Sequence, residues 1–162
     1  MLVVSDTSPL INLAIIGNLD LLPQLFTKIV IPRMVFDEIT IQGAGMPGAD
    51  EIREAIWIEV IDGKNKALFT ALRKIVDPGE AEAIVVAMET GADLLLIDER
   101  LGRQVAKDYD IPVLGILGIL KIAKKKSCIN LVKPLLDRLI SEAGFRVSAN
   151  LYREVLTDVG ES

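Results

Sequence analysis

Short apolar runs alternate along the chain with longer segments in which apolar residues recur every three or four positions. The short runs predict strands over 2–6, 28–31, 57–61, 94–98 and 111–114. Helical spacing follows over about 10–16, 18–25, 33–41, 49–55, 64–75, 80–90, 99–109, 115–126, 130–143 and 148–157. This alternation predicts an α/β fold, a three-layer α/β/α sandwich around a parallel sheet.

Turn and cap residues mark the ends of several of these elements. Thr7 or Ser8 is expected to cap the first helix, with Pro9 at its first helical position. The sequence Asp77-Pro78-Gly79 is expected to break the chain before the helix at 80–90. The glycine- and proline-rich residues 42–48 form the loop in which we expect the greatest mobility.

The composition is that of a folded domain. The chain has 162 residues, of which 51% are hydrophobic and 25% charged. We therefore predict one domain over residues 1–162, with residues 128–162 as a C-terminal helical extension. No apolar run has the length of a membrane span, no secretory signal is visible, and Cys128 has no cysteine to pair with. These features predict a cytoplasmic protein without a membrane partner.

The distribution of charge is more informative than the net charge of −5, which argues against a protein that coats DNA electrostatically. Residues 1–98 carry 15 acidic and 7 basic side chains, whereas residues 99–138 carry 4 acidic and 9 basic ones. Such a division would let a metal site lie beside a phosphate-binding surface. The alternative is that these charges belong to ordinary solvated helix faces.

Two aspartates, Asp6 and Asp98, stand at the ends of the predicted strands 2–6 and 94–98. In open parallel sheets the functional crevice lies outside the carboxyl ends of the strands, so these two carboxylates could meet in one cleft. The chain contains no histidine. Its chemistry is therefore expected to depend on carboxylates, with a bound hard cation.

Further acids lie on two of the predicted helices. Glu38 lies beside the apolar face of helix 33–41, and Glu80 shares a face with the apolar residue Ile84. Glu82 aligns instead with Glu89, on what is expected to be the solvated side. Clustered carboxylates without histidine suit Mg²⁺ or Mn²⁺, and one or two such ions can activate water for attack on phosphorus.

Several of these motifs, taken in order, resemble the PIN-domain ribonucleases. The similar segments are Val4-Ser5-Asp6-Thr7-Ser8-Pro9-Leu10-Ile11, Ile31-Pro32 with Glu38-Ile39, Gly79-Glu80-Ala81-Glu82-Ala83-Ile84 and Leu96-Ile97-Asp98-Glu99-Arg100. Each motif is short, and their order and spacing make the combination specific. The similarity extends to about residue 126, and the step from Glu80 to Asp98 matches the usual spacing of the family's third and fourth acids better than a step from Glu82 does.

The resemblance implies a five-stranded parallel sheet in the order 3-2-1-4-5 and a metal-dependent endoribonuclease. Asp6, Glu38, Glu80 and Asp98 would bind one or two Mg²⁺ or Mn²⁺ ions, and a water activated there would attack the RNA phosphodiester in line. A similar Gly-Glu-Ala-Glu-Ala segment in flap endonucleases makes Glu82 a secondary metal ligand. Ser8 lies where the family often has a small polar residue that supports the site.

A basic stripe next to these acids is a candidate for substrate binding. Arg100, Arg103 and Lys107 share one face of the helix after Asp98 and could hold the RNA backbone. An ordinary exposed helix face is an equally good interpretation of the stripe. The run Lys124–Lys126 is expected to be solvated or to favour a helix end.

Many bacterial and archaeal PIN proteins are toxins of toxin–antitoxin pairs, of the virulence-associated protein C type, and act on RNA as homodimers. The resemblance therefore implies an RNA substrate, an antitoxin partner and a homodimer, although the longer C-terminal portion departs from the compact toxins. Two alternatives remain. One is a catalytically silent PIN fold that binds nucleic acid or serves in assembly. The other, a phospho-acceptor receiver domain, fits poorly because Asp6 has no adjacent second acid.

Overall fold

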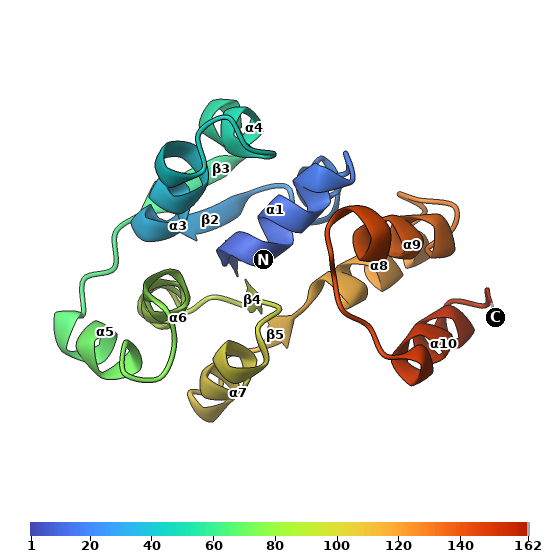
Figure 1. The fold of residues 1–162 in the computed structure, drawn as a ribbon. Helices are drawn as coiled ribbons and strands as arrows, with labels where there is room; N and C mark the ends of the chain where they lie inside the picture. Colours follow the sequence, from blue (N-terminus) through green and yellow to red (C-terminus); the bar gives the residue numbers. More distant parts are fainter. Residues whose placement is uncertain (162) are drawn as a thin grey trace.

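Five parallel strands form one sheet in the order β3-β2-β1-β4-β5, which confirms the predicted topology (Figure 1). The computed structural model describes residues 1–161, and Ser162, the last residue of the predicted extension, lies outside the described residues. The strands are β1 (Val3–Ser5), β2 (Ile29–Pro32), β3 (Ile58–Ile61), β4 (Leu94–Leu96) and β5 (Val113–Leu114). The strand order reverses between β1 and β4, where such sheets open a crevice.

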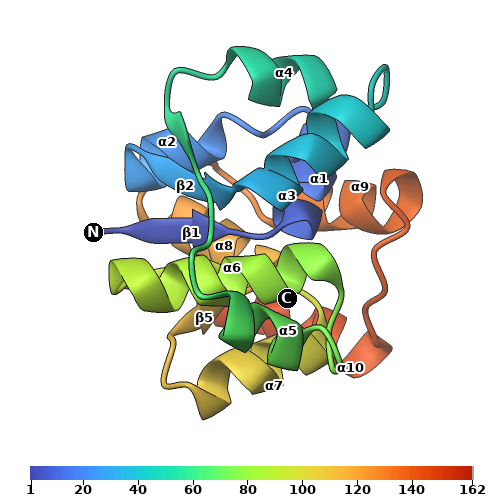
Figure 2. The same ribbon diagram turned by 90° about the vertical axis from the view of Figure 1, so that its left-hand side faces the viewer.

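Helices cover both faces of the sheet because alternate strand residues point to opposite sides. Val3 and Leu96 pack with α1 (Thr7–Ile15), α2 (Leu21–Phe26) and α8 (Ile116–Lys125). Val4 and Leu95 pack with α5 (Lys66–Leu72), α6 (Pro78–Thr90) and α7 (Arg100–Asp108), which gather on one side of β1 in Figure 2. The three-layer prediction is therefore confirmed.

The segment after β2 is helical, as predicted, but it changes its helix type. The helix α3 (Arg33–Asp37) continues into a π-helical turn, η1 (Glu38–Gln42), and α4 (Ala49–Glu54) follows. The Gly43 amide donates to the Glu38 carbonyl five residues back, at 2.8 Å, which is the π-helical pattern. Apolar periodicity predicts a helix here but does not distinguish these two hydrogen-bond patterns.

The predicted extension folds onto the helices of the first layer. Its helices are α9 (Lys133–Glu142) and α10 (Ala149–Asp158), and their buried residues Leu136, Leu139 and Val155 join the same apolar cluster as α1 and α8. Arg138 Nη1 donates to the Ile16 carbonyl at the end of α1, at 2.8 Å. Residues 128–161 are therefore packed against the sheet-covering helices and share their core.

Two predicted boundaries are wrong. The first helix begins at Thr7, so Pro9 is its third residue and neither Thr7 nor Ser8 caps it. The helix predicted over 80–90 begins at Pro78, and the Asp77 side chain caps it. Both errors arise because a cap is defined by backbone geometry, which residue type alone does not determine. Within residues 1–161, no helix combines the length and apolar character needed to span a membrane.

Candidate metal centre and the groove beside it

Strand pairing brings Asp6 and Asp98 to the same edge of the sheet. Ser5 pairs with Leu96 across β1 and β4, and the Asp6 amide extends the ladder by donating to the Leu96 carbonyl at 2.9 Å. Asp6 directly follows β1 and is only 4% exposed, whereas Asp98 lies two residues beyond the end of β4. The two aspartates therefore lie at the same edge of the sheet, where the strand order reverses, and the charge of Asp98 helps to raise the pKa of Asp6.

Three carboxylates converge on Gly79, at the start of α6. A Cβ atom at Gly79 would lie 3.4 Å from Glu38 Oε2, 3.6 Å from Asp6 Oδ1 and 3.7 Å from Asp77 Oδ1. These are ordinary van der Waals distances, so Gly79 marks the space that the three acids share. A hollow of about 340 Å³ adjoins it and is lined by Asp37, Glu38, Asp77 and Gly79, among others.

The position of Glu38 depends on two neighbouring elements. It is the first residue of η1, and its exposed side chain accepts a hydrogen bond from the Thr7 hydroxyl at the start of α1. Ser8, the predicted supporting residue, has an exposed side chain. The hydroxyl that contacts the acid cluster therefore belongs to Thr7, the first residue of a helix that begins two residues earlier than the sequence suggests.

Asp77 is an acid of this cluster that our reasoning from sequence missed. Its Oδ1 atom caps α6 by accepting the Glu80 amide at 2.9 Å. The interpretation of Asp77-Pro78-Gly79 as a chain break concealed that an N-cap carboxylate lies at the same helix end as Glu80. The capping residue Asp followed three positions later by Glu is the signal that could have revealed it.

Glu80 is buried, at 7% exposure, as predicted for the inward-facing acid of its helix. A Cβ atom at Gly102 of α7 would lie only 2.9 Å from Glu80 Oε2, so the glycine makes room for the carboxyl group. Burial, repulsion by Asp77 and Asp6, a hydrogen bond with Asp77 and the charge of Glu99 together raise the pKa of Glu80 to about 8.

Asp6 has a similarly raised pKa. Burial is the largest cause, and repulsion from Asp77, Glu38 and Asp98 adds to it, while a hydrogen bond from the Thr7 amide acts in the opposite direction. The net effect raises the pKa of Asp6 from 3.8 to about 7. Near neutral pH the cluster therefore holds protons that a cation would displace.

Asp98 faces α8 with one oxygen and leaves the other without a partner. Its Oδ1 atom accepts the Ile116 amide at 2.8 Å. Its Oδ2 atom is the one buried side-chain oxygen or nitrogen among residues 1–161 that has no hydrogen-bond partner. Burial raises the pKa of Asp98, although the Ile116 amide and the nearby Arg103 guanidinium oppose the rise. An orphaned buried carboxylate oxygen is costly, which favours a cation or a proton there.

Glu82 corrects one expectation, since it is buried at 7% exposure and does not lie on a solvated face. Its Oε1 atom accepts the Met34 amide at 2.8 Å, and its Oε2 atom accepts the Gly63 amide at 3.1 Å. Both oxygens thus tie α6 to the segments after β2 and β3. This arrangement favours a structural role for Glu82. Its role as a secondary metal ligand stays a prediction.

The basic stripe on α7 divides into two kinds of residue. Arg100 and Lys107 are exposed, whereas Arg103 is half-buried and donates to the Ile97 carbonyl at 3.2 Å. A Cβ atom at Gly115 would lie 2.5 Å from Arg103 Nη1 and 2.8 Å from Asp98 Oδ1. Arg103 is therefore packed beside Asp98, and the two exposed residues are the better placed to meet a phosphate.

The acids suit a hard divalent cation in their chemistry and charge. Oxygen ligands are those that Mg²⁺ and Mn²⁺ prefer, and a cation would relieve the repulsion around Asp6 and occupy the orphaned oxygen of Asp98. Within residues 1–161, no group of three or more His, Cys, Asp or Glu side chains already has an arrangement that could hold a metal ion. A cation held by three of these acids would therefore need them to rearrange from the positions described.

The sheet order and the acids gathered at its switch point define a PIN-like α/β domain. The family model DUF3368, described as a PIN domain, matches residues 2–161, and the chain therefore belongs to this family. PIN domains are typically nucleases and commonly bind Mg²⁺ or Mn²⁺. Searches of curated proteins and of solved structures gave no match.

Proposed function

We propose that this chain is a metal-dependent endoribonuclease. The observation that carries the proposal is the gathering of Asp6, Glu38, Glu80 and Asp98 where β1 and β4 adjoin, together with the raised pKa values of Asp6 and Glu80. Acids with raised pKa values in a crevice are typical of a functional site.

Each acid has a distinct part in this proposal. Asp6 and Asp98 hold one or two Mg²⁺ or Mn²⁺ ions from the strand ends, while Glu38 and Glu80 approach from the helices. Such an ion, when bound, stabilises charge on the phosphate and makes water a stronger nucleophile. Thr7 orients Glu38 through its hydroxyl, and the Ile116 amide orients Asp98.

The test is cleavage of labelled single-stranded RNA and DNA with Mg²⁺, Mn²⁺ or EDTA. We expect cutting of RNA that requires metal and falls by about 100-fold or more in Asp98→Asn, because a lost metal ligand impairs the charge stabilisation. Asp20→Asn is the matched control, since Asp20 is an exposed acid at the start of α2. Equal cutting by the two variants, or cutting in EDTA, would contradict the proposal.

A catalytically silent PIN fold that binds nucleic acid or serves in assembly is the second candidate. The observation that favours it is that the acids of residues 1–161 are not already arranged to hold a metal ion. This candidate predicts that wild-type protein binds RNA and does not cut it under any metal. Isothermal titration with Mn²⁺ separates the two, because the silent fold is expected to bind no stoichiometric ion.

The toxin role, the antitoxin partner and the homodimer extend the proposal to the protein's partners. Met34, Ile41 and Met46 are exposed apolar side chains between β2 and α4, at 38%, 66% and 66%, and support an association surface there. Light scattering of the purified chain tests for the dimer. Growth arrest on expression, relieved by co-expression of a neighbouring gene, tests for the toxin and its antitoxin.

A further inference from the structure

We infer that the C-terminal extension builds the outer wall of a groove for single-stranded RNA beside the acid cluster. The inference rests on the proposed function for its choice of ligand and concerns residues for which that function assigns no role. The residues from the extension are Phe145, Arg146 and Leu151. They are spatially joined to the basic stripe of α7, although about 40 residues separate them from it in the sequence.

The groove has a volume of about 640 Å³ and begins at Asp98. Its cationic side chains are Arg100, Arg103, Lys107, Lys121 and Arg146, and Asp98 is the acid among its described lining residues. Of these cations, only Lys121 has an ion-pair partner among residues 1–161, and Arg100, Arg103, Lys107 and Arg146 have none. The groove is thus complementary to a chain of phosphates that leads to the metal-binding acids.

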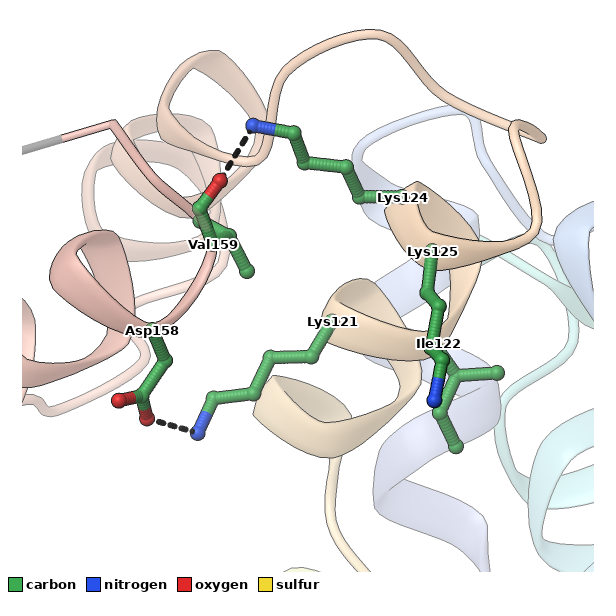
Figure 3. Close-up of a pocket in the computed structure, with 6 residues that line it drawn as sticks. All are labelled: Lys121, Ile122, Lys124, Lys125, Asp158 and Val159. Atoms are coloured by element: carbon green, nitrogen blue, oxygen red, sulfur yellow. Dashed lines mark hydrogen bonds and ion pairs between the residues drawn. The ribbon is translucent and has the colours of Figure 1, made fainter.

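Contacts next to this wall hold the extension against α8 and Phe145 against α9. Lys121 of α8, which lines the groove, pairs with Asp158 of α10 at 2.7 Å, and Lys124 Nζ donates to the Val159 carbonyl at 2.6 Å (Figure 3). The Phe145 amide donates to the Leu139 carbonyl of α9 at 3.0 Å. The wall is therefore an integral part of the fold. The residues on both sides of the groove are positioned without a ligand.

The apolar lining of the groove favours a single strand over a duplex. Leu114, Leu117 and Phe145 supply apolar surface, and Phe145 is a half-buried aromatic in a chain with 4% aromatic residues. Unpaired bases can lie against such a surface and stack on an aromatic ring, whereas a duplex keeps its base faces covered. A groove lined by both cations and apolar side chains therefore suits the phosphates and the unpaired bases of a single strand.

The experiment measures binding by the full chain in the Asp6→Asn background, which leaves the groove intact and prevents cutting. Fluorescence anisotropy follows a labelled single-stranded RNA of about 12 nucleotides over a range of salt concentrations. We expect Arg146→Ala to weaken binding by about fivefold and to reduce the salt slope by about 0.7, the value for one phosphate contact on a single strand. Phe145→Leu is expected to weaken binding about fivefold without changing the salt slope.

Arg153→Ala is the matched control, because Arg153 is an exposed cation of α10 that does not line the groove. Binding equal to that of the control in both groove variants would overturn the inference, as would tighter binding of duplex RNA or of single-stranded DNA of the same sequence. In the cutting-competent chain we expect Arg146→Ala to raise KM and leave kcat unchanged. RNA binding by the wild-type chain without cutting contradicts only the proposed function. Cutting by Arg146→Ala with the KM of the wild type contradicts only the groove.

Discussion

Asp6 is a buried carboxyl group surrounded by other acids. Its pKa of about 7 means that, without a metal, the folded chain holds a proton there that the unfolded chain would release above pH 4. Glu80, with a pKa of about 8, behaves in the same way. Asp77 contributes to both shifts, so this N-cap residue belongs to the electrostatics of the site as well as to the helix.

The first prediction concerns stability without metal as a function of pH. An acid with a raised pKa in the folded state contributes stability below its unfolded pKa and loses that contribution as pH rises through the folded pKa. In EDTA, Asp6 and Glu80 should therefore lower the free energy of unfolding between pH 4 and pH 8. Urea titrations at several pH values measure this decline.

Asp6→Asn should flatten the decline and raise the free energy of unfolding at pH 8 in EDTA by about 2 kcal/mol. Asp77→Asn, which keeps an oxygen to cap α6, should change stability in the same direction by less. Saturating Mg²⁺ or Mn²⁺ should stabilise the wild type at pH 8 and Asp6→Asn much less. A wild-type stability that rises with pH in EDTA would contradict this account of the acid cluster.

At the scale of elements, close approach between α6 and α7 positions the acids. Gly102 of α7 leaves room for the Glu80 carboxyl group, and Gly79 of α6 lies in the space that Glu38 and Asp6 share. The π-helical turn η1 adds to this arrangement. Its wider hydrogen-bond pattern begins at Glu38 and changes the course of the chain at this acid. Small residues and an irregular helix turn therefore determine which side chains reach the crevice.

Gly102→Ala tests this packing. In an exposed helix the change would stabilise by about 1 kcal/mol, but here the new Cβ would lie 2.7 Å from Ile97 Cδ1 and 2.9 Å from Glu80 Oε2. We expect a loss of about 1–2 kcal/mol from overpacking and weaker Mn²⁺ binding because Glu80 moves. Chemical denaturation and Mn²⁺ titration check both, with Gln104→Ala, an exposed position of α7, as the control. A higher free energy of unfolding in Gly102→Ala would show that α7 does not pack tightly against Glu80.

At the scale of the whole molecule, residues 128–161 share the core of the sheet-covering helices, and Glu161 joins several of these segments. Glu161, whose side chain is 6% exposed, pairs with Lys124 at 2.9 Å. It also accepts the Val132 amide at 2.7 Å. One carboxylate thus joins the end of α8, the start of α9 and the segment after α10.

Glu161→Ala should therefore destabilise the entire chain. Loss of the ion pair and of the hydrogen bond to the Val132 amide should lower the free energy of unfolding by about 2 kcal/mol and the Tm by about 4–8 °C. Thermal unfolding measured by circular dichroism checks this, with Glu154→Ala on the exposed face of α10 as the control. If the 128–162 extension is part of one domain, as the sequence predicts, unfolding should stay a single transition. Separate melting of the extension would contradict that prediction.

Much of the fold and part of the site follow from sequence. Strand runs ending in Asp6 and Asp98 predict their meeting because parallel strands share one carboxyl edge, and the face of Glu80 follows from helical periodicity. Asp77, Thr7 and the structural contacts of Glu82 could not be predicted in this way. They depend on helix starts and on backbone amides from distant segments, which periodicity does not encode.

The sequence by itself thus determined the layers, the strand order through the family resemblance, and which acids end the strands, because these follow from local periodicity and residue order. Only the tertiary structure decided that Glu82 accepts hydrogen bonds from two amides, that Asp98 keeps an unpartnered oxygen and that Arg146 lines the same groove as Arg100 and Lys107. The physical reason is that burial and hydrogen bonding arise between segments far apart along the chain. They exist only once those segments are packed.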